Sequence, residues 1–249
     1  MTATLIINAD DLGYDPAVTR GILEAMNQGV VSSTTMIVNG PHSEDAGKKV
    51  HGTVLGIGLH VNLARWQPVS KVPKYLLGPD GGFVEGKIVE LPVEVVEHET
   101  LAQLERLKAL TGRAASHLDV HKHLHKNPLV LEGIGRVALK LKLPLRSIDA
   151  PMRRTLRERG VVTNDAFIGD AGEQAYWTTE RLRTHLWALP TEGSVELMCH
   201  PGYAPITLKS GYSAQREVEL ATFLSDQARD WLDARELSPT SWWALHPPA

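Results

Sequence analysis

The sequence has little of several features that would place it in a specialised class of protein. Cys199 is the only cysteine in 249 residues, which excludes an intramolecular disulfide and gives no sign of an oxidising compartment. The 26 lysines and arginines are outnumbered by 29 aspartates and glutamates, and the formal net charge is -3. Because a protein that binds many phosphates needs a basic surface, this balance argues against a nucleic-acid partner.

Long apolar runs are also missing. No stretch of the sequence approaches the roughly 18 uncharged apolar residues that a membrane span needs. Residues 1–4 lead directly into a strand pattern, without the basic segment and long apolar stretch of a signal peptide. We therefore expect a cytoplasmic protein with no membrane span.

What the sequence does contain is an alternation of short apolar segments with helix-length segments. This order predicts a parallel sheet with helices outside it. With 249 residues and 43% hydrophobic content, we expect one α/β domain over residues 1–249, an irregular (β/α) barrel resembling a TIM barrel. A doubly wound open sheet is the alternative. The predicted strands are 4–8, 34–38, 55–59, 116–120, 145–148 and 195–198, and the predicted helices are 16–27, 42–50, 93–110, 128–141 and 214–234.

Residues 64–91 interrupt this alternation. The segment is rich in proline and glycine, which break helices and strands, and so it predicts a long surface loop. Long loops on compact enzymes are often lids or walls of the substrate site, and we expect that role here. The region 149–176 is irregular and predicts no clear element.

Polar residues follow four of the predicted strands at the point where each strand ends. Asp10 and Asp11 follow the first strand, and His60, His121 and His200 follow three others. An isolated Asp pair is about as typical of a turn or helix cap as of an active site, and a lone histidine is more often structural than a ligand. Because parallel strands deliver their carboxyl ends to one face of a barrel, we nevertheless expect these residues to converge there.

The segment 117–125 carries four histidines and one aspartate at alternate positions. Side chains of a strand alternate between its faces, so an extended segment would place all five on one face. An exposed edge strand with a polar face is the alternative. Because the strand is predicted to end near His121, His123 and His125 belong to the following loop, where contact with a substrate or support of the ligands is expected.

One carboxylate and two imidazoles make a three-ligand metal site that leaves positions for water and a substrate oxygen. The remaining aspartate and histidine are then free to move protons. This inventory is typical of metal-assisted hydrolysis, which needs a polarised carbonyl, an activated water, a base and an acid.

The sequence contains an ordered series of motifs: Leu5–Gly13, Gly29–Thr35, Val38–Gly40, Gly58–His60, His117–His125, Leu145–Arg146 and Met198–Pro201. This series resembles the YdjC-like family, which includes chitooligosaccharide deacetylases. The matching blocks occur in family order and span about residues 5–203, although Leu12 and Lys122 replace residues usual in the family. The resemblance implies a (β/α) barrel, a divalent metal usually assigned as Mg²⁺ with Zn²⁺ or another ion possible, and hydrolysis of the acetamide of an N-acetylglucosamine unit.

The resemblance also implies roles for individual residues. Asp11, His60 and His121 would be the metal ligands, and Asp10 would be the base. His200 would donate a proton to the leaving group, and Arg146 would hold Asp10 by a charge-assisted hydrogen bond. Asn39, His123 and His125 are expected to contact the substrate.

Two other classes of function fit parts of the pattern. One is a phosphoesterase or amidohydrolase with a similar metal site, although phosphoryl transfer usually needs a second metal or several cationic side chains nearby. The other is a non-catalytic regulator that binds sugars. The expected partner is a carbohydrate or glycolipid substrate. A homodimer is possible, because Trp242 and Trp243 could form either a core element or a dimer surface.

Overall fold

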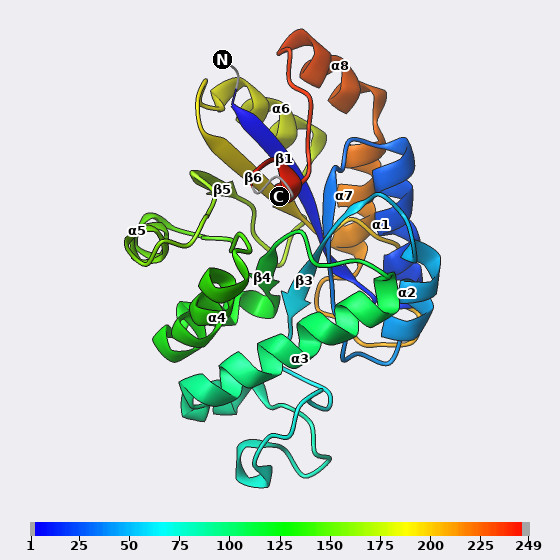
Figure 1. Ribbon diagram of the computed structural model, residues 1–249. Helices are drawn as coiled ribbons and strands as arrows, with labels where there is room; N and C mark the ends of the chain where they lie inside the picture. The colour runs from blue at the N-terminus through cyan, green and yellow to red at the C-terminus, as the bar shows by residue number, and fades with distance from the viewer. Residues whose placement is uncertain (1–2, 246–249) are drawn as a thin grey trace.

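The computed structural model describes residues 3–245, and its centre is a parallel sheet (Figure 1). The strand order is β4-β3-β2-β1-β6-β5, and every pairing is parallel. The carboxyl ends of these strands therefore meet at one end of the sheet. The strands are β1 (Thr4–Leu12), β2 (Ser33–Met36), β3 (Gly56–Val61), β4 (Leu118–Val120), β5 (Ala166–Ile168) and β6 (Ser194–Cys199).

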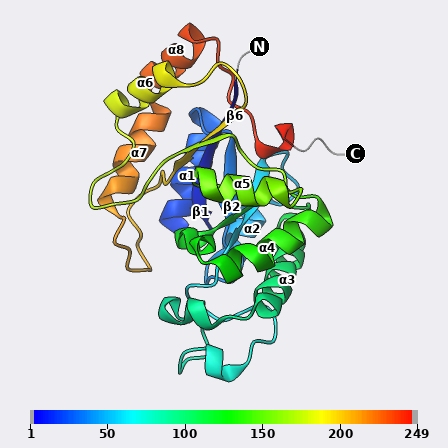
Figure 2. The same cartoon turned by 90° about the vertical axis from the view of Figure 1, so that its left-hand side faces the viewer.

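Helices surround the curled sheet, as the two ribbon views show (Figures 1 and 2). This confirms the expected irregular (β/α) barrel. The helices are α1 (Pro16–Gln28), α2 (Ser43–Val50), α3 (Val93–Thr111), α4 (Pro128–Leu141), α5 (Ala150–Glu158), α6 (Thr179–Ala188), α7 (Ala214–Leu224) and α8 (Asp226–Ala234). Short 3₁₀ helices are η1 (Lys74–Leu76), η2 (Glu85–Glu90), η3 (His121–Lys126) and η4 (Trp242–Ala244).

The side chains of β1 alternate between an apolar layer beneath the helices and the interior of the barrel. Leu5 and Ile7 pack in the apolar layer beneath the helices, together with Val18 and Ile22 of α1. The intervening Asn8 and Asp10 of β1 are equally buried but point to the other face of the strand, inside the barrel. The barrel interior is therefore polar, and its groups must satisfy one another because burying them unpaired is costly.

The barrel closes through a segment that is not a regular strand. The predicted strand 145–148 is reduced to one bridge between Leu145 and Leu118 of β4. On its other side, the Leu145 N–H donates to Val162 O, and Asn164 exchanges hydrogen bonds with the backbone of Ser147. We call residues 144–147 and 162–164 the seam, because they join the β4 edge to the chain that enters β5.

One helical prediction is wrong, and one region without a predicted element contains a helix and a strand. The predicted helix 214–234 is two helices, because Ser225 adopts an extended conformation and its hydroxyl caps α8 by accepting the Ala228 N–H. The region without a predicted element contains α5 and β5, and α6 follows it. Asp149 begins α5 as a cap that accepts the Met152 N–H, a local signal present in the sequence.

The segment 64–91 is irregular apart from η1 and η2, but it is not detached from the core. Leu76, Phe83 and Ile88 are buried in the hydrophobic cluster. An ion pair between Glu85 of this segment and Lys122 of η3 connects the loop to the histidine-rich turn. Its action as a lid stays a prediction.

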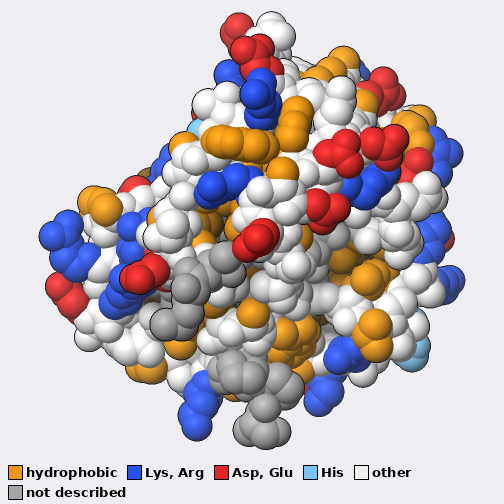
Figure 3. Space-filling view, turned by 90° about the horizontal axis from the view of Figure 1, so that it is seen from above, with side chains coloured by type: hydrophobic (Ala, Val, Ile, Leu, Met, Phe, Trp, Pro, Cys, Tyr) orange, Lys and Arg blue, Asp and Glu red, His pale blue; other side chains and the backbone are white. Residues whose placement is uncertain are grey.

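The C-terminal tryptophans differ in their surroundings. Trp242 is fully buried and stacks on His117 with 4.7 Å between ring centroids, so it is a core residue. Trp243 is half-buried. The face seen from above carries acidic and basic side chains interspersed, without a continuous basic surface (Figure 3). Within residues 3–245, none of the helices combines the length and apolar character needed to span a bilayer.

Candidate active site

The acidic pair occupies the irregular end of β1 rather than the loop beyond it. The register between β1 and β2 shifts between Ala9 and Leu12, and Asp11 has a φ of 77°. An irregularity of this kind breaks the simple alternation of side chains and redirects one of them. Asp10 and Asp11 thus both reach the carboxyl end of the barrel and make different contacts there.

Asp11, His60 and His121 come together as predicted, although they come from β1, β3 and the start of η3. Asp11 Oδ1 lies 3.4 Å from His60 Nε2 and 3.2 Å from His121 Nδ1, and the two ring nitrogens are 3.2 Å apart. Each of these side chains is at least nine-tenths buried. Three ligands about 2.1 Å from one divalent ion lie roughly 3.0–3.5 Å apart, so this triangle fits a metal ion.

Asp119 orients one corner of the triangle. Its Oδ1 lies 2.6 Å from His60 Nδ1, and its Oδ2 accepts the Thr35 hydroxyl at 2.9 Å. Because Nδ1 faces Asp119, Nε2 is the nitrogen of His60 left to bind a metal ion in place of its proton, the arrangement common for metal-binding histidines. Burial lowers the pKa of His60, but the carboxylates of Asp119, Asp11 and Asp10 outweigh it and raise the pKa to about 10. The site therefore favours positive charge.

Arg146 lies at the centre of a buried cluster of carboxylates. Its Nη1 and Nη2 each donate to Asp10 at 2.7 Å, and Nη1 also lies 2.8 Å from Asp119. The Glu196 carboxylate accepts from Nε and Nη2. Burial alone would raise the pKa of Asp10, but Arg146 outweighs it and lowers that pKa, whereas burial raises the pKa of Glu196 to about 7 despite Arg146. Asp10 is thus the carboxylate that stays ionised.

His200 follows β6 and lines the same cavity, but its ring lacks the carboxylate that would favour protonation. The Glu219 carboxylate accepts the His200 backbone N–H at 2.6 Å, and the ring Nδ1 is buried without a partner among the described residues. Burial lowers the pKa of His200 to about 4, while Asp10 and Asp11 act in the opposite direction. The imidazole is therefore neutral at neutral pH.

The three residues expected to contact substrate are in different places. His123 is half-buried, lines the cavity and packs on Phe167 with 5.5 Å between ring centroids. His125 is fully buried behind it and is not part of the cavity lining. Asn39 is also outside the lining, where it accepts from Asn62 and donates to Gln67 O. Of these three residues, only His123 is therefore positioned to contact a molecule in the cavity.

A cavity of about 800 Å³ opens over these groups. It is bounded by the ends of β1, β3 and β6, by η3, and by the loop that precedes α7. Basic side chains are more numerous around it than the local sequence suggested. They are Arg65, Lys122, Lys126, Lys209 and Arg216, and the acidic Asp170 and Glu173 line the same cavity.

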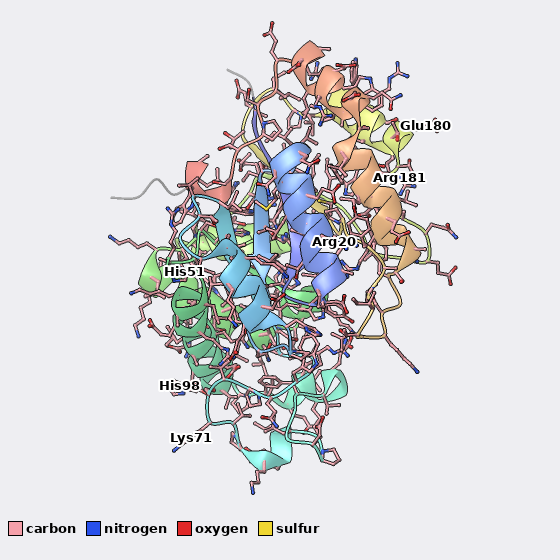
Figure 4. All side chains as sticks on the ribbon, turned by 90° about the vertical axis from the view of Figure 1, so that its right-hand side faces the viewer. Arg20, His51, Lys71, His98, Glu180 and Arg181 are labelled. Carbon is pink, nitrogen blue, oxygen red and sulfur yellow. The ribbon has the colours of Figure 1, made fainter. Side chains whose placement is uncertain are left out.

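Sequence reasoning missed several residues that support the site. Asp119 was part of the alternating motif, and Glu196 is the single charge within an otherwise apolar strand, so both carried a local signal. Arg216 and Glu219 lie on α7, and nothing near them in the sequence indicates the site. Conversely, the exposed His51 and His98 lie on the outside of the molecule, at the end of α2 and on α3 (Figure 4).

Known proteins resemble this chain over most of its length. A sequence profile of the family described as YdjC-like protein matches residues 4–234. A carbohydrate deacetylase of Geobacillus stearothermophilus is 36% identical over 222 residues and covers 87% of each chain. A chitooligosaccharide deacetylase of Serratia marcescens is 34% identical over 232 residues, which are 88% of this chain and 90% of the relative.

Solved structures share the fold. A crystal structure from Enterococcus faecalis V583, named for cellobiose-phosphate cleavage, has a TM-score of 0.86 and 29% identity, covering 98% of this chain and 99% of that one. The Xyl-CE4 domain of a multidomain xylanase from the hindgut metagenome of Trinervitermes trinervoides has a TM-score of 0.58. It covers 98% of this chain and 90% of that one, and at 9% identity it shows a shared fold alone.

Proposed function

This chain belongs to the YdjC-like protein family, and from that membership we propose that it is a metal-dependent carbohydrate deacetylase. The substrate would be an N-acetylglucosamine unit of an oligosaccharide or glycoconjugate, from which the enzyme removes the N-acetyl group. The observation that carries the proposal is the triangle of Asp11, His60 and His121 beside the ionised Asp10, at the floor of one cavity. Relatives named carbohydrate and chitooligosaccharide deacetylases support the substrate class.

Asp11, His60 and His121 would hold the metal. A divalent ion bound there would polarise the acetamide carbonyl and make a bound water more acidic. Two observations favour a cation at this point: Asp11 Oδ1 is buried without a hydrogen-bond partner among the described residues, and the surrounding carboxylates hold the pKa of His60 high. Mg²⁺ is implied by the family resemblance, whereas two imidazole ligands are more typical of Zn²⁺ or a related transition ion.

Asp10 would act as the base that removes a proton from the attacking water. Arg146 fixes both carboxylate oxygens of Asp10 and lowers its pKa, so the group is ionised at neutral pH. His200 would give a proton to the departing amine. Because its imidazole is neutral in the resting site, it would become protonated only after negative charge has developed on the substrate beside it.

Release of acetate tests the proposal directly. We expect the purified chain to release acetate from at least one member of a panel of N-acetylated oligosaccharides and glycolipids. Exhaustive chelation should abolish this release, and single additions of Mg²⁺, Mn²⁺, Co²⁺ or Zn²⁺ should identify the ion that restores it. Full activity after metal removal, verified by elemental analysis, would refute metal dependence, and turnover of no panel member would favour a sugar-binding regulator.

A second candidate is hydrolysis of a phosphorylated sugar. The basic side chains around the cavity favour it, and the Enterococcus relative is named for cleavage of a phosphorylated disaccharide. Two-metal phosphoryl transfer is less favoured. A second ion near the triangle would need the carboxylates of Asp10 and Asp119, and both already pair with Arg146. Phosphate release from phosphorylated disaccharides, without acetate release from N-acetylated ones, would select this function.

A further inference from the structure

Arg216 of α7 reaches the metal triangle from the side opposite to His60 and His121. Its Nη2 lies 2.5 Å from Asp11 Oδ2, while Asp11 Oδ1 is the oxygen that faces the two histidines. The same carboxylate is therefore shared between the guanidinium and the candidate metal position. Arg216 is only 3% exposed, yet it lines the cavity.

The guanidinium is held rigidly. Its Nε donates to the Tyr212 carbonyl oxygen at 3.0 Å. The rings of Tyr14 and Tyr212 lie over it, with 5.7 and 5.9 Å from Cζ to the ring centroids. Three kinds of contact thus fix one planar cation, and little conformational freedom is left for it to lose when it binds a further group.

One donor of this fixed cation is unused. Arg216 Nη1 is buried and finds no hydrogen-bond acceptor among the described residues. A buried, unpartnered donor of a charged group is unfavourable, and sites of function are where such groups are retained. Because the guanidinium is planar, Nη1 lies beside the Nη2 that touches Asp11, and Arg216 and Asp11 both line the cavity.

We propose that Arg216 is a catalytic residue whose Nη1 donates to the oxygen of the acetyl group while Nη2 holds Asp11. This inference rests on the proposed deacetylase function. As the water oxygen gives a proton to Asp10 and bonds to the acetamide carbon, the carbonyl electron pair moves onto the carbonyl oxygen, where a fixed donor stabilises the negative charge. That electron pair then re-forms the C=O bond as the C–N bond breaks, the departing nitrogen takes a proton through His200, and the same oxygen becomes part of acetate.

The test separates the two donors of Arg216 and uses acetate itself as the probe. In Arg216→Lys, one ammonium can still pair with Asp11, but the second donor is gone. We expect this variant to bind metal, measured by calorimetry, within about threefold of the parent. Its affinity for acetate, measured by NMR titration of the metal-loaded protein, and its kcat should fall on the order of 10- to 100-fold, as for a lost charge-assisted hydrogen bond.

Arg65→Gln is the matched control, because Arg65 lines the same cavity but its Nη1 already donates to Tyr14. It should leave acetate affinity within about twofold, since the lost charge is at the rim. Parent-like acetate binding by both Arg216→Lys and Arg216→Gln would overturn the inference. So would equal loss of metal and acetate in both variants, which would make Arg216 only a positioning residue for Asp11.

Failure of the proposed function gives a different result. If the parent binds acetate in an Arg216-dependent way but releases none from any N-acetylated substrate, the deacetylase proposal fails and the anion contact stands. If the metal-loaded parent binds no acetate while it deacetylates sugars, the contact proposed for Arg216 is wrong and the function stands.

Discussion

Asp10 and Asp11 are neighbours in sequence with different electrostatic partners. Arg146 donates hydrogen bonds to both carboxylate oxygens of Asp10. Asp11 instead pairs with Arg216 through one oxygen and lies close to the two histidines through the other. We predict that Asp11→Asn lowers metal occupancy, because the amide is a weaker ligand. Asp10→Asn should retain the metal and lose about 10²- to 10⁴-fold in turnover, the usual contribution of a general base. Metal analysis and acetate release measure the two effects, and an Asp10→Asn variant within a few-fold of the parent would exclude the base role.

The buried imidazole of His200 makes the stability of the fold depend on pH. Burial lowers its pKa from 6.5 to about 4 in the folded chain. Between these values the unfolded chain binds a proton that the folded chain does not, so this group stabilises the fold above pH 6.5 and loses that contribution as the pH falls towards 4. We predict that His200→Gln reduces the loss of unfolding free energy between pH 7.5 and pH 4.5 by about 1–2 kcal/mol.

Urea unfolding of the metal-free parent and the His200→Gln variant at both pH values measures this difference. The comparison between variants is needed because Glu196 and Glu219, whose pKa values burial raises to about 7, contribute with the opposite sign. Their contribution is lost as the pH rises through that value, in parent and variant alike. Identical pH dependence in both proteins would mean that His200 is solvated in the folded chain.

Residue types and their spacing predicted which side chains meet, but not how deep each one lies. The alternation through 117–125 correctly placed His117, Asp119 and His121 on the inner side of the barrel. Period two gives the face of a strand and not the level along the barrel axis. His117 therefore lies beneath the site against Trp242, Asp119 supports His60, and only His121 reaches the triangle.

The contact between β3 and β4 depends on Gly58 of β3, a residue that has no side chain. A Cβ added to Gly58 of β3 would lie 2.4 Å from the His117 ring, which is itself stacked on Trp242. Because the ring is fully buried and stacked, either the ring or the two strands would have to shift. We predict that Gly58→Ala lowers the free energy of unfolding by about 1–3 kcal/mol, the usual cost of overpacking.

The matched control for Gly58 is Gly86 in η2, where an added Cβ meets nothing within 4 Å. Gly86→Ala should change stability by less than about 0.5 kcal/mol, as is usual for surface substitutions. Denaturant unfolding compares the two variants with the parent. Equal stability of Gly58→Ala and Gly86→Ala would show that His117 can yield, and that the contact does not restrict β3.

Strongly periodic elements were predicted well, and elements defined by tertiary contacts were not. Helices α1 and α4 begin at proline after capping Asp15 and Asn127, so their starts could be read from the sequence. The break between α7 and α8 was missed because Ser225 interrupts the pattern for one residue only. Strand β5 is three residues long, and its pairing with β6 comes from the closing of the barrel.

The alternation of strands and helices in the sequence predicted a barrel, but it did not predict how the two edges of the sheet are joined. The six strands leave β4 and β5 as edges, and the seam between them has little regular pairing. Beside the hydrogen bond from the Leu145 N–H to Val162 O, one buried amide joins the two sides of the seam. The Asn164 side chain accepts the Ser147 N–H at 2.7 Å and donates to Ser147 O and Ala166 O, both at 2.9 Å. No local pattern identifies such a residue, because its main partner, Ser147, lies 17 residues away in the sequence.

This dependence gives a prediction about the whole barrel. Asn164→Leu preserves size but leaves the Ser147 N–H and C=O buried and unpaired, which should cost about 2–4 kcal/mol of unfolding free energy. Because Ser147 is next to Arg146, loosening the seam should also disturb the arginine that fixes Asp10, and activity should fall even where the chain remains folded. Amide hydrogen exchange measures the first effect as faster exchange over 144–147 and 162–166, and acetate release measures the second. Asn164→Asp is the control, since its carboxylate still accepts the Ser147 N–H and should retain more protection than leucine. Unchanged exchange across the seam in Asn164→Leu would mean that the apolar contacts of Leu145 and Val161 alone hold the barrel closed.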